Sequence, residues 1–418
     1  MKVLHISSND VLGGAAKACL ALDRSLNNSG ITSSVLVQKK VGNQLNVNSI
    51  SHSIYKKYSA RFREGIEFFY NKYFVNEKYG RFSPAFIGAD LSRESVLKDA
   101  DIIHLHWINE GFLSPNTFNY LFKLRKPIIW TLHDMWAITG GCHYNGNCPN
   151  YLNECSICPA LKISGRNDVS AKAFRKKQIL FDTMDLNIVT CSNWLAGEAK
   201  RSIILFNKKV QAIPNTVDVE KFFKIDKNIA REKLQLSNEK IYLLFASMTA
   251  KDERKGFRYF LEALNYLYDE YSQLRSTLEI LLIGRMEENM LCEFKFPVIS
   301  FGRINDDEKL NYIYNSAEVF VAPSLQDNLP NTIMESLVCG VPSVAFNIGG
   351  IPDMIEHFYN GYLAENISGK CLADGIFWCV SDTERREFLS INSRKKFLNY
   401  FAPKIIAEKY INLYRSVI

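Results

Sequence analysis

The stretch that decides the fold is VAPSLQDNLPNTIMESLVCGVPSVAF, residues 321–346. The apolar run 319–322 predicts a short buried strand, and the helix after it is entered through Pro330 and ended at Gly340, which are the usual positions for these residue types. A second apolar strand follows at 342–346. This order places the helix N-terminus at the carboxyl edge of a parallel sheet, where unpaired N–H groups and the helix dipole favour an anionic ligand.

Two acids mark this stretch. Asp327 lies in the predicted turn, and Glu335 follows eight residues later, inside the helix. Asp327 can face a ligand from the turn. Glu335 has two interpretations: it contacts the ligand, or it completes a capping box with Thr332, because Thr332-x-x-Glu335 has the S/T-x-x-E spacing.

An acid, seven residues and Glu335, followed by the run from Cys339 to Pro342, resembles the sugar-nucleotide signature of the retaining glycosyltransferases of family 4. The sequence departs at Asp327, where the family more often has Glu, and at Leu329-Pro330, where it often has Phe-Gly. The resemblance implies a GT-B fold and metal-independent transfer, with no catalytic cofactor. A sugar would move from a UDP- or GDP-sugar to a glycan or polyprenyl-linked acceptor, in the biosynthesis of a cell-surface polysaccharide such as capsule or O-antigen.

The resemblance also implies roles for individual residues. Asp327 and His133, which ends a predicted strand at 126–134, would position the sugar, and Glu335 would hold the ribose. Lys255 would neutralise the diphosphate, since no metal shares that charge. The remaining donor-binding positions that it implies are Gly13, Gly14, Asn328, Leu329, Asn331 and Thr332.

The arginine that ends the first strand of the second domain in the family is missing. Ala246-Ser247 stands there instead, and a slightly longer loop offers Lys251 and Arg254. We expect Arg254 to replace the missing cation beside Lys255, with Lys251 as the alternative.

Length and composition describe an ordinary globular protein. A chain of 418 residues exceeds one core, and 47% hydrophobic with 23% charged residues excludes a disordered chain. The net charge of +7 suits an anionic substrate or a membrane surface better than nucleic acid. No signal-peptide pattern and no apolar run of membrane-spanning length stand out, so we expect a cytoplasmic protein, with a place at the inner face of the membrane left open.

Strands and helices alternate throughout the sequence. This pattern predicts an α/β protein with two doubly wound, Rossmann-like domains, which in the GT-B fold face each other across a cleft. We expect an acceptor-side domain at 1–218 and a nucleotide-sugar domain at 219–400. Residues 401–418 predict a helix that packs back on the first domain.

Residues 50–90 are rich in aromatic and cationic side chains. A basic amphipathic segment of this kind can lie on anionic lipid. We favour the alternative, in which a pair of helices packs its aromatic rings on its own domain, because aromatic stripes are usually core.

Four cysteines, Cys142, Cys148, Cys155 and Cys158, have the spacing C-x5-C-x6-C-x2-C. They suit a tetrahedral structural zinc, although the spacing lies outside the common finger patterns and His143 complicates the ligand set. A cluster of buried thiols or a labile disulfide stays open. His104 and His106 share one strand face and, with no third ligand in view, are interpreted as structural or cleft-lining.

The sequence also leaves a second, non-catalytic function open. The missing strand-end arginine and the aspartate at 327 also suit a non-catalytic sugar-nucleotide or glycan-binding relative that acts as a scaffold. A GT-B epimerase is a third class, for which the sequence offers nothing specific.

Overall fold

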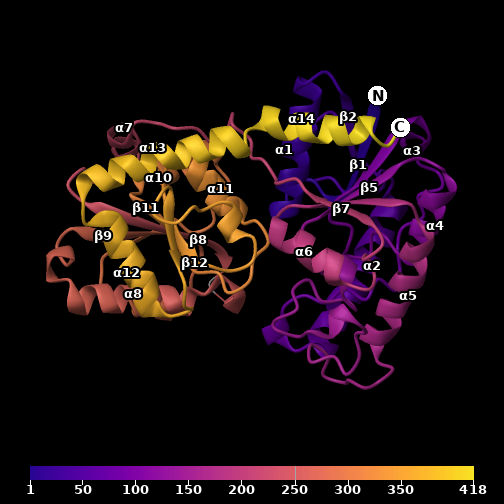
Figure 1. Ribbon diagram of the computed structural model, residues 1–418, viewed down its shortest axis with the longest axis horizontal. Helices are drawn as coiled ribbons and strands as arrows, with labels where there is room; N and C mark the ends of the chain where they lie inside the picture. Colours follow the sequence, from indigo (N-terminus) through magenta and orange to yellow (C-terminus); the bar gives the residue numbers. More distant parts are fainter. Residues whose placement is uncertain (250) are drawn as a thin grey trace. The chain divides into compact units, whose positions relative to one another are not determined.

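The computed structural model describes residues 1–249 and 251–418 (Figure 1). Its contacts divide the chain into two compact units: Met1–Asn215 with Lys404–Ile418, the N-terminal unit, and Thr216–Pro403, the C-terminal unit. Each unit is built on one parallel sheet with helices, seven strands in the first and six in the second. The predicted fold class, two doubly wound α/β units, is confirmed.

The N-terminal unit has the strand order β3-β2-β1-β4-β5-β6-β7. The strands are β1 (Lys2–Asn9), β2 (Thr32–Lys39), β3 (Val47–Ser49), β4 (Ile102–Leu105), β5 (Ile128–Leu132), β6 (Leu186–Thr190) and β7 (Lys209–Ala212). The helices are α1 (Gly14–Asn28), α2 (Ile54–Phe74), α3 (Val96–Asp99), α4 (Pro115–Lys123), α5 (Val169–Thr183), α6 (Asn193–Arg201) and α14 (Pro403–Arg415). β1, β4, β5 and β6 are buried almost throughout, as expected for parallel strands covered on both faces.

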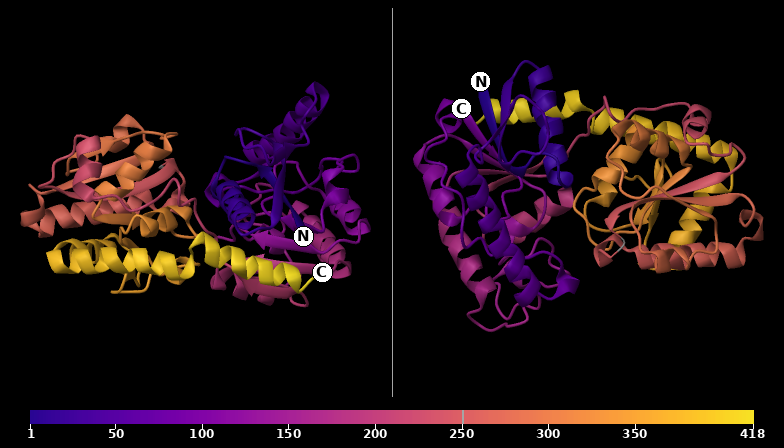
Figure 2. Two further views of the ribbon diagram at one scale, coloured as in Figure 1. Left: turned by 90° about the horizontal axis from the view of Figure 1, so that it is seen from above. Right: turned by 180° about the vertical axis from the view of Figure 1, so that it is seen from behind.

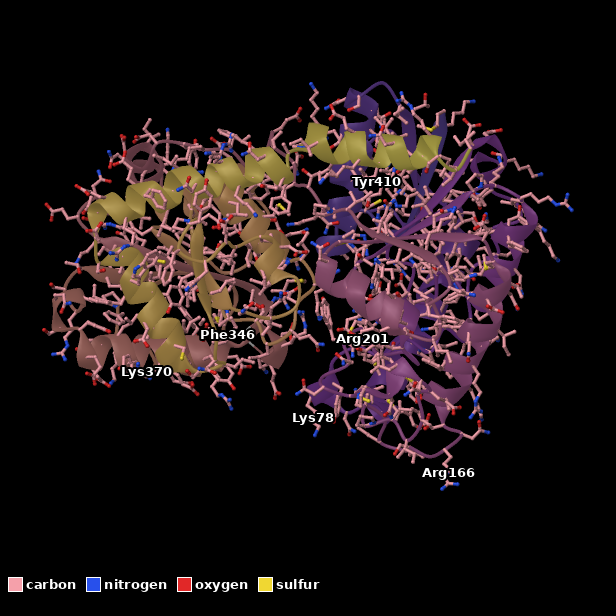
Figure 3. The ribbon with its side chains drawn as sticks, viewed as in Figure 1. Lys78, Arg166, Arg201, Phe346, Lys370 and Tyr410 are labelled. Atoms are coloured by element: carbon pink, nitrogen blue, oxygen red, sulfur yellow. The ribbon has the colours of Figure 1, made fainter. Side chains whose placement is uncertain are left out.

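The C-terminal helix α14 is part of the N-terminal unit, where the two chain ends also lie (Figure 2). Ile406, Tyr410 and Tyr414 pack with Val3 and other apolar side chains of β1, α1, β4, β5 and β6. Figure 3 labels Tyr410, whose hydroxyl lies 2.9 Å from the Thr131 hydroxyl. These buried contacts fix the last helix on the first sheet.

The C-terminal unit has the strand order β10-β9-β8-β11-β12-β13. The strands are β8 (Ile241–Thr249), β9 (Leu278–Arg285), β10 (Val298–Ser300), β11 (Val319–Ala322), β12 (Ser343–Phe346) and β13 (Gly361–Ala364). The helices are α7 (Lys227–Lys233), α8 (Phe257–Glu270), α9 (Glu288–Leu291), α10 (Asp307–Ser316), α11 (Asn331–Val338), α12 (Gly369–Val380) and α13 (Thr383–Tyr400). The chain adds β9 and β10 on one side of β8, then β11 to β13 on the other.

Six short 3-10 helices complete the described elements: η1 (Glu77–Tyr79), η2 (Trp136–Ile138), η3 (Asn150–Leu152), η4 (Glu253–Lys255), η5 (Ser272–Leu274) and η6 (Ile351–Asp353). The central stretch folds as predicted into β11, α11 and β12. Gly340 has a φ of 69° directly after the C-cap of α11, a conformation that favours glycine.

The favoured interpretation of residues 50–90 is wrong for most of the aromatic side chains. The segment forms one long helix, α2, instead of a pair, and buries only Ala60 and Glu67 of its residues. The exposed aromatic residues of α2 are Tyr55, Tyr58, Phe62, Phe68, Phe69, Tyr73 and Phe74. Phe82, further along, is fully buried.

Candidate active site

The strand order of the C-terminal unit reverses between β8 and β11. At such a switch point the connections leave neighbouring strands in opposite directions, which opens a crevice at their carboxyl ends. η4 follows β8 there, and the turn with Asp327 follows β11. Gly256 joins η4 to α8 with a φ of 68°, and a Cβ on it would meet the Pro323 carbonyl oxygen at 1.8 Å. Glycine is therefore needed for the two loops to touch.

Asp327 is the centre of this contact. Its Oδ2 accepts a hydrogen bond from Lys255 Nζ at 2.6 Å and lies 3.4 Å from Arg254 Nη1, while only 6% of the residue is exposed. Burial raises the pKa of the carboxyl group, but Lys255, Arg254 and the Asn328 backbone N–H outweigh it, so the pKa stays below its ordinary value of 3.8. Asp327 is therefore an anion held between two cations.

Arg254 has further partners that the sequence did not suggest. Its Nη1 donates to the Gln326 carbonyl oxygen at 2.9 Å, and its Nη2 lies 3.1 Å from Asp252 Oδ2. Lys251, the alternative cation, is 67% exposed at its side chain and pairs with Glu287 at 2.7 Å instead. The structure therefore brings Arg254, and not Lys251, to Lys255 and Asp327.

A glycine pair after β12, Gly349 and Gly350, packs against the backbone of the turn that contains Asp327. Gly350 N–H donates to the Asp327 carbonyl oxygen at 3.2 Å. Gly349 has a φ of 54°, and a Cβ on it would meet that same oxygen at 2.0 Å. This close approach of two backbones explains the glycine at position 349 without a ligand.

Glu335 does not belong to a capping box, because α11 begins at Asn331 and its N-cap is Pro330. Thr332 lies inside the helix. Glu335 is buried and its Oε2 accepts a hydrogen bond from the Tyr314 hydroxyl at 2.7 Å. Burial and the Glu335 carboxylate raise the pKa of Tyr314 well above its usual value, so this hydroxyl stays a donor.

The remaining predicted donor residues of this unit surround the start of α11. Asn328 and Leu329 are buried in the turn, whereas Asn331 and Thr332 are half-buried in the first helical turn. Pro330, the N-cap residue of α11, makes no capping hydrogen bond with its side chain. In the N-terminal unit, Gly13 is the exposed N-cap of α1 with a φ of 86°, and Gly14 is the first residue of that helix.

A row of three histidines runs through the N-terminal unit, where the strand order reverses between β1 and β4. His5 Nδ1 lies 2.9 Å from His106 Nε2, and His106 Nδ1 lies 3.1 Å from His133 Nε2. A neutral imidazole donates with one nitrogen and accepts with the other, so the donors of the row all point the same way. His133 Nδ1 continues to the Cys191 sulfur at 3.5 Å. The row therefore couples the tautomer of His133 to those of His106 and His5.

All these imidazoles are neutral near pH 7. Burial lowers the pKa of His5 to about 3 and that of His133 to about 4, and it lowers the pKa of His104 and His106 well below 6.5. His133, half-buried at the end of the row, is therefore suited to hydrogen bonding with a neutral hydroxyl, and not to neutralising a charge.

His104 belongs to a different set of contacts. Its Nδ1 lies 2.8 Å from the Tyr414 hydroxyl, and its Nε2 lies 2.8 Å from the Thr131 hydroxyl. The structural interpretation of His104 agrees with these contacts, since they hold α14. The sequence analysis did not predict the neighbours of His106. Among the described residues, His5, Cys19 and His106 are the one group of three whose potential metal-binding atoms all lie within 4.8 Å of one another. β1, α1 and the end of β4 bring them together, which no local pattern could show.

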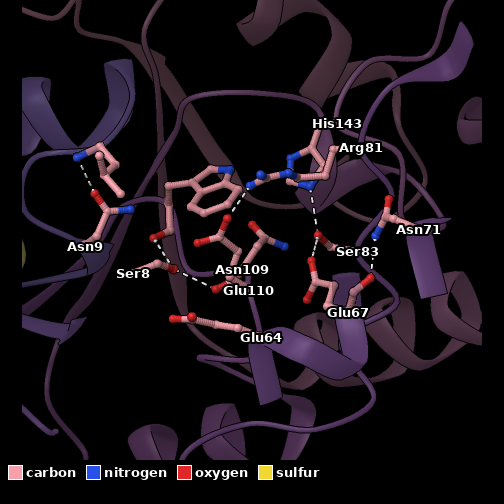
Figure 4. A network of polar contacts seen from close by, with 12 residues as sticks. Ser8, Asn9, Glu64, Glu67, Asn71, Arg81, Ser83, Asn109, Glu110 and His143 are labelled. Carbon is pink, nitrogen blue, oxygen red and sulfur yellow. Dashed lines mark hydrogen bonds and ion pairs between the residues drawn. The ribbon is translucent and has the colours of Figure 1, made fainter. Parts of the chain in front are cut away.

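A polar network, part of which is drawn in Figure 4, connects Asp134 with His143 and Ser83. Asp134 Oδ2 accepts from Trp107 Nε1 at 2.9 Å and lies 2.7 Å from His143 Nδ1. His143 Nε2 lies 2.9 Å from the Ser83 hydroxyl, which also donates to Glu67. Burial raises the pKa of Asp134, but His143 and the hydrogen bonds outweigh it and keep the carboxyl group ionised.

The same network includes an exposed ion pair. Arg81 Nη1 lies 2.7 Å from Glu110 Oε1, and its guanidinium lies 5.2 Å from the centre of the Trp107 ring. Nearby, the Ser8 hydroxyl donates to the Asn109 carbonyl oxygen at 2.7 Å (Figure 4). The network thus ties the ends of β1, β4 and β5 to the segment that follows α2.

The four cysteines of the predicted zinc site line one small cavity, together with other side chains. In the described structure, no three of the four sulfur atoms lie within 4.8 Å of one another, a spacing that a preformed metal site would show. None of the described cysteines forms a disulfide.

The comparisons with known proteins agree with this architecture. The pattern described as Glycosyltransferase Family 4 matches residues 12–221, and the one described as Glycosyl transferases group 1 matches 239–382. The putative colanic acid biosynthesis glycosyl transferase WcaC of Escherichia coli strain K12 is 23% identical, with 100% of both chains covered. The UDP-Gal:alpha-D-GlcNAc-diphosphoundecaprenol alpha-1,3-galactosyltransferase of Escherichia coli is 25% identical over 50% of this chain and 55% of that protein.

Among solved structures, Anabaena Alr3699/HepE in complex with UDP-glucose matches with a TM-score of 0.65 at 16% identity, covering 100% of both chains. The two-sheet fold is thus that of the GT-B glycosyltransferases, and the protein is a glycosyltransferase. The chain belongs to glycosyltransferase family 4, whose pattern matches half of its residues. The resemblance drawn from residues 327–342 is confirmed.

The neutral histidines predict a steep acid dependence of stability. Their folded pKa values lie below 6.5, so the unfolded chain takes up protons first as the pH falls. Their contribution is complete above pH 6.5 and is lost toward pH 4, by up to ~1.4 kcal/mol per pH unit for each histidine. Urea unfolding should be followed by fluorescence in a Trp378→Phe background, because the other tryptophans lie in the N-terminal unit.

The control for this prediction compares slopes, not absolute stabilities. His133→Asn should lower the slope between pH 6.5 and 4.5 by about the share of one histidine, whereas the exposed His52→Asn should leave it unchanged. A stability that stays flat from pH 7.5 to 5 would contradict neutral burial of the row.

Proposed function

We propose that this enzyme is a retaining, metal-independent glycosyltransferase that moves a sugar from a nucleotide-diphosphate sugar to a glycan acceptor. The observation that carries the proposal is the pair of cations, Lys255 and Arg254, on the buried Asp327 at the switch point of the C-terminal unit. A diphosphate leaving group needs positive charge, and two fixed cations supply it without a metal.

Each residue then has a role. Lys255 and Arg254 bind the diphosphate, with the N-terminus of α11 and residues Asn328 to Thr332 beside it. Asp327 binds the sugar and stabilises the positive charge that develops on its ring. Glu335 holds the ribose. We assign His133 to a sugar hydroxyl, and Gly13 and Gly14 to the diphosphate.

The bonds exchanged are simple. The bond from the anomeric carbon to the diphosphate oxygen breaks, and a bond from that carbon to the acceptor oxygen forms on the same face. The acceptor hydroxyl loses its proton to the departing diphosphate.

The names of the relatives indicate which donor and acceptor substrates to propose for this chain. The Anabaena structure contains UDP-glucose, and the Escherichia coli galactosyltransferase uses UDP-Gal by its name, so we propose a UDP-sugar before a GDP-sugar. The name of that enzyme also gives a diphosphoundecaprenol acceptor, and WcaC belongs to colanic acid biosynthesis. We therefore propose that the acceptor of this chain is a polyprenyl-linked glycan in the biosynthesis of a cell-surface polysaccharide. Neither the described residues nor the comparisons favour a non-catalytic scaffold.

The first prediction concerns the reaction. With UDP-sugars and polyprenyl-diphosphate-linked acceptors, we expect UDP release coupled to a glycosylated product that keeps the donor's anomeric configuration by NMR. The rate should be unchanged in EDTA, because Lys255 and Arg254 carry the leaving-group charge. An inverted product, or strict dependence on magnesium or manganese, would contradict the proposal.

The second prediction separates the charged residues. Lys255→Ala and Arg254→Ala should each lose about 1.5–3 kcal/mol of charge-assisted bonding, a fall of roughly 10- to 150-fold in kcat/KM. Asp327→Asn should lower kcat more than it weakens UDP binding, and Glu335→Gln should weaken UDP binding directly.

Lys251→Ala is the matched control, since this lysine pairs with Glu287 outside the site. It should keep activity within about twofold of the unchanged enzyme. If Arg254→Ala were fully active and Lys251→Ala were not, the cation beside Lys255 would be misassigned.

We also propose that α2 places the enzyme on an anionic membrane, at the inner face, where a polyprenyl-linked acceptor and a cytoplasmic donor meet. Its exposed aromatic side chains are joined by the exposed cations Lys57, Arg61 and Lys72, and by Lys78 after the helix. Figure 3 labels Lys78. The two acids of α2, Glu64 and Glu67, are half-buried and buried. None of the described helices is long and apolar enough to cross a bilayer.

This proposal predicts binding to vesicles. The protein should sediment with vesicles of mixed anionic and zwitterionic lipid, but not with purely zwitterionic ones, and salt should weaken the binding. Tyr58→Ser with Phe62→Ser should weaken it about tenfold, since on the order of 1.5 kcal/mol of ring burial is lost. Phe388→Ser, an exposed ring of the C-terminal unit, is the control. Equal binding by all variants would exclude α2.

A further inference from the structure

The cysteine loop encloses a cavity of about 20 Å³. This volume suffices for one guest of the size of a water molecule. The lining residues include the four cysteines and four aromatic residues, which offer few hydrogen bonds to a water: Cys142, Cys148, Cys155, Cys158, Tyr79, Phe82, Tyr144 and Tyr151. The cavity therefore suits a guest that binds sulfur.

Several backbone and hydroxyl groups point at these sulfurs. Gly140 N–H donates to the Cys155 sulfur at 3.2 Å. Burial raises the pKa of Cys158, and hydrogen bonds from the Ala160 backbone and the Ser170 side chain oppose this increase. N–H groups directed at sulfur stabilise a thiolate, and a bound metal ion would stabilise the thiolate form further.

A buried cation, Lys177, contacts the start of the cysteine loop. Lys177 is only 3% exposed, and its Nζ donates to the Trp136 and Thr139 carbonyl oxygens at 2.5 and 3.0 Å. Burial lowers its pKa to about 7, and the acidic groups that oppose this are Cys155, Cys142 and Asp134. None of the ion pairs found among the described residues includes Lys177.

A buried ammonium group needs negative charge nearby. Lys177 Nζ lies 3.6 Å from the centre of the Trp136 ring, and the ionised Asp134 is one of the groups that act on it. Four thiolates around one Zn²⁺ carry a net charge of −2, which would add to the negative charge that Asp134 supplies near Lys177.

We propose that Cys142, Cys148, Cys155 and Cys158 bind one Zn²⁺ in a closed, structural tetrahedral site. Binding releases the four thiol protons and forms four Zn–S bonds, with no redox change and no open position for substrate. Zn–S bonds of about 2.3 Å set the sulfurs about 3.8 Å apart. In the described structure no three of these sulfurs lie within 4.8 Å of one another, so the sulfurs would have to move closer together to bind the ion.

The site would hold more than its own loop. Cys142 forms an isolated bridge with Phe82, and Leu161 forms one with Val75, so the loop is joined at two points to the segment after α2. His143, directly after the first cysteine, contacts Asp134 and Ser83. Zinc would thereby fix the polar network of Figure 4.

The test is the metal content of the full-length protein, purified without added zinc. Elemental analysis should find about one zinc per chain, released when a mercurial reagent blocks the thiols. Replacement by Co²⁺ should give the intense sulfur-to-cobalt charge-transfer band and the visible d–d bands of a tetrahedral sulfur site. The cobalt spectrum needs no substitution, so it stays decisive if cysteine variants fail to fold.

Variants locate the ion. Cys148→Ser should lose the zinc, whereas Cys292→Ser, an exposed cysteine elsewhere, and Cys19→Ser, from the group with His5 and His106, should each keep it. His143→Gln should also keep it, because His143 already contacts Asp134 and Ser83. Metal-free protein with four freely titrating thiols, a disulfide by mass spectrometry, or iron in place of zinc would overturn the proposal. Zinc content is read without any transfer assay, so its outcome is independent of the proposed function.

Discussion

The C-terminal unit depends on one interaction, the ion pair between Lys255 and Asp327. The two residues lie 72 positions apart, and they meet only because β8 and β11 are neighbours in the sheet while the chain between them builds β9 and β10 on the other side. Gly256 and Gly349 serve the same contact, since each lets a backbone come closer than any side chain would allow. A buried carboxylate without these cations would carry an uncompensated charge. The fold therefore positions the charges, and the charges require the glycines.

The N-terminal unit handles its polar groups in the opposite way. At its own switch point it buries histidines that stay neutral, which pair with one another and with the Tyr414 hydroxyl of α14, while His5 Nε2 is left without a hydrogen-bond partner among the described residues. Neutral hydrogen-bonding rings suit sugar hydroxyls, and cations suit a diphosphate. The histidine row and the pair of cations therefore differ in the chemistry that they offer. The row also makes the orientation of His133 depend on His5, a residue two contacts away.

Local features and family patterns could be predicted from the sequence. Pro330 and Gly340 marked the ends of α11, and the spacing of Asp327 and Glu335 pointed to the family. The capping box failed because Thr332 already lies inside the helix, so Glu335 turns to Tyr314, a partner on α10. Exposure of the α2 aromatic residues escaped prediction because their spacing fits a core helix equally well. His5 and Cys19 were missed because only the pairing of β1 with β4, and the position of α1, bring them to His106.

Residues 139–168 raise a problem of their own, because the only regular element described within them is the three-residue η3. Long irregular loops are uncommon in compact domains and need internal contacts to hold one conformation. Here the apolar contacts centre on Phe82 and the last two cysteines' neighbours, Ala160 and Leu161, which is a small core. Yet this loop must present His143 to Asp134 within hydrogen-bond distance. A small core that fixes a precise polar contact is the situation in which domains use a metal or a disulfide, and four cysteines that line one cavity suit the metal that we propose.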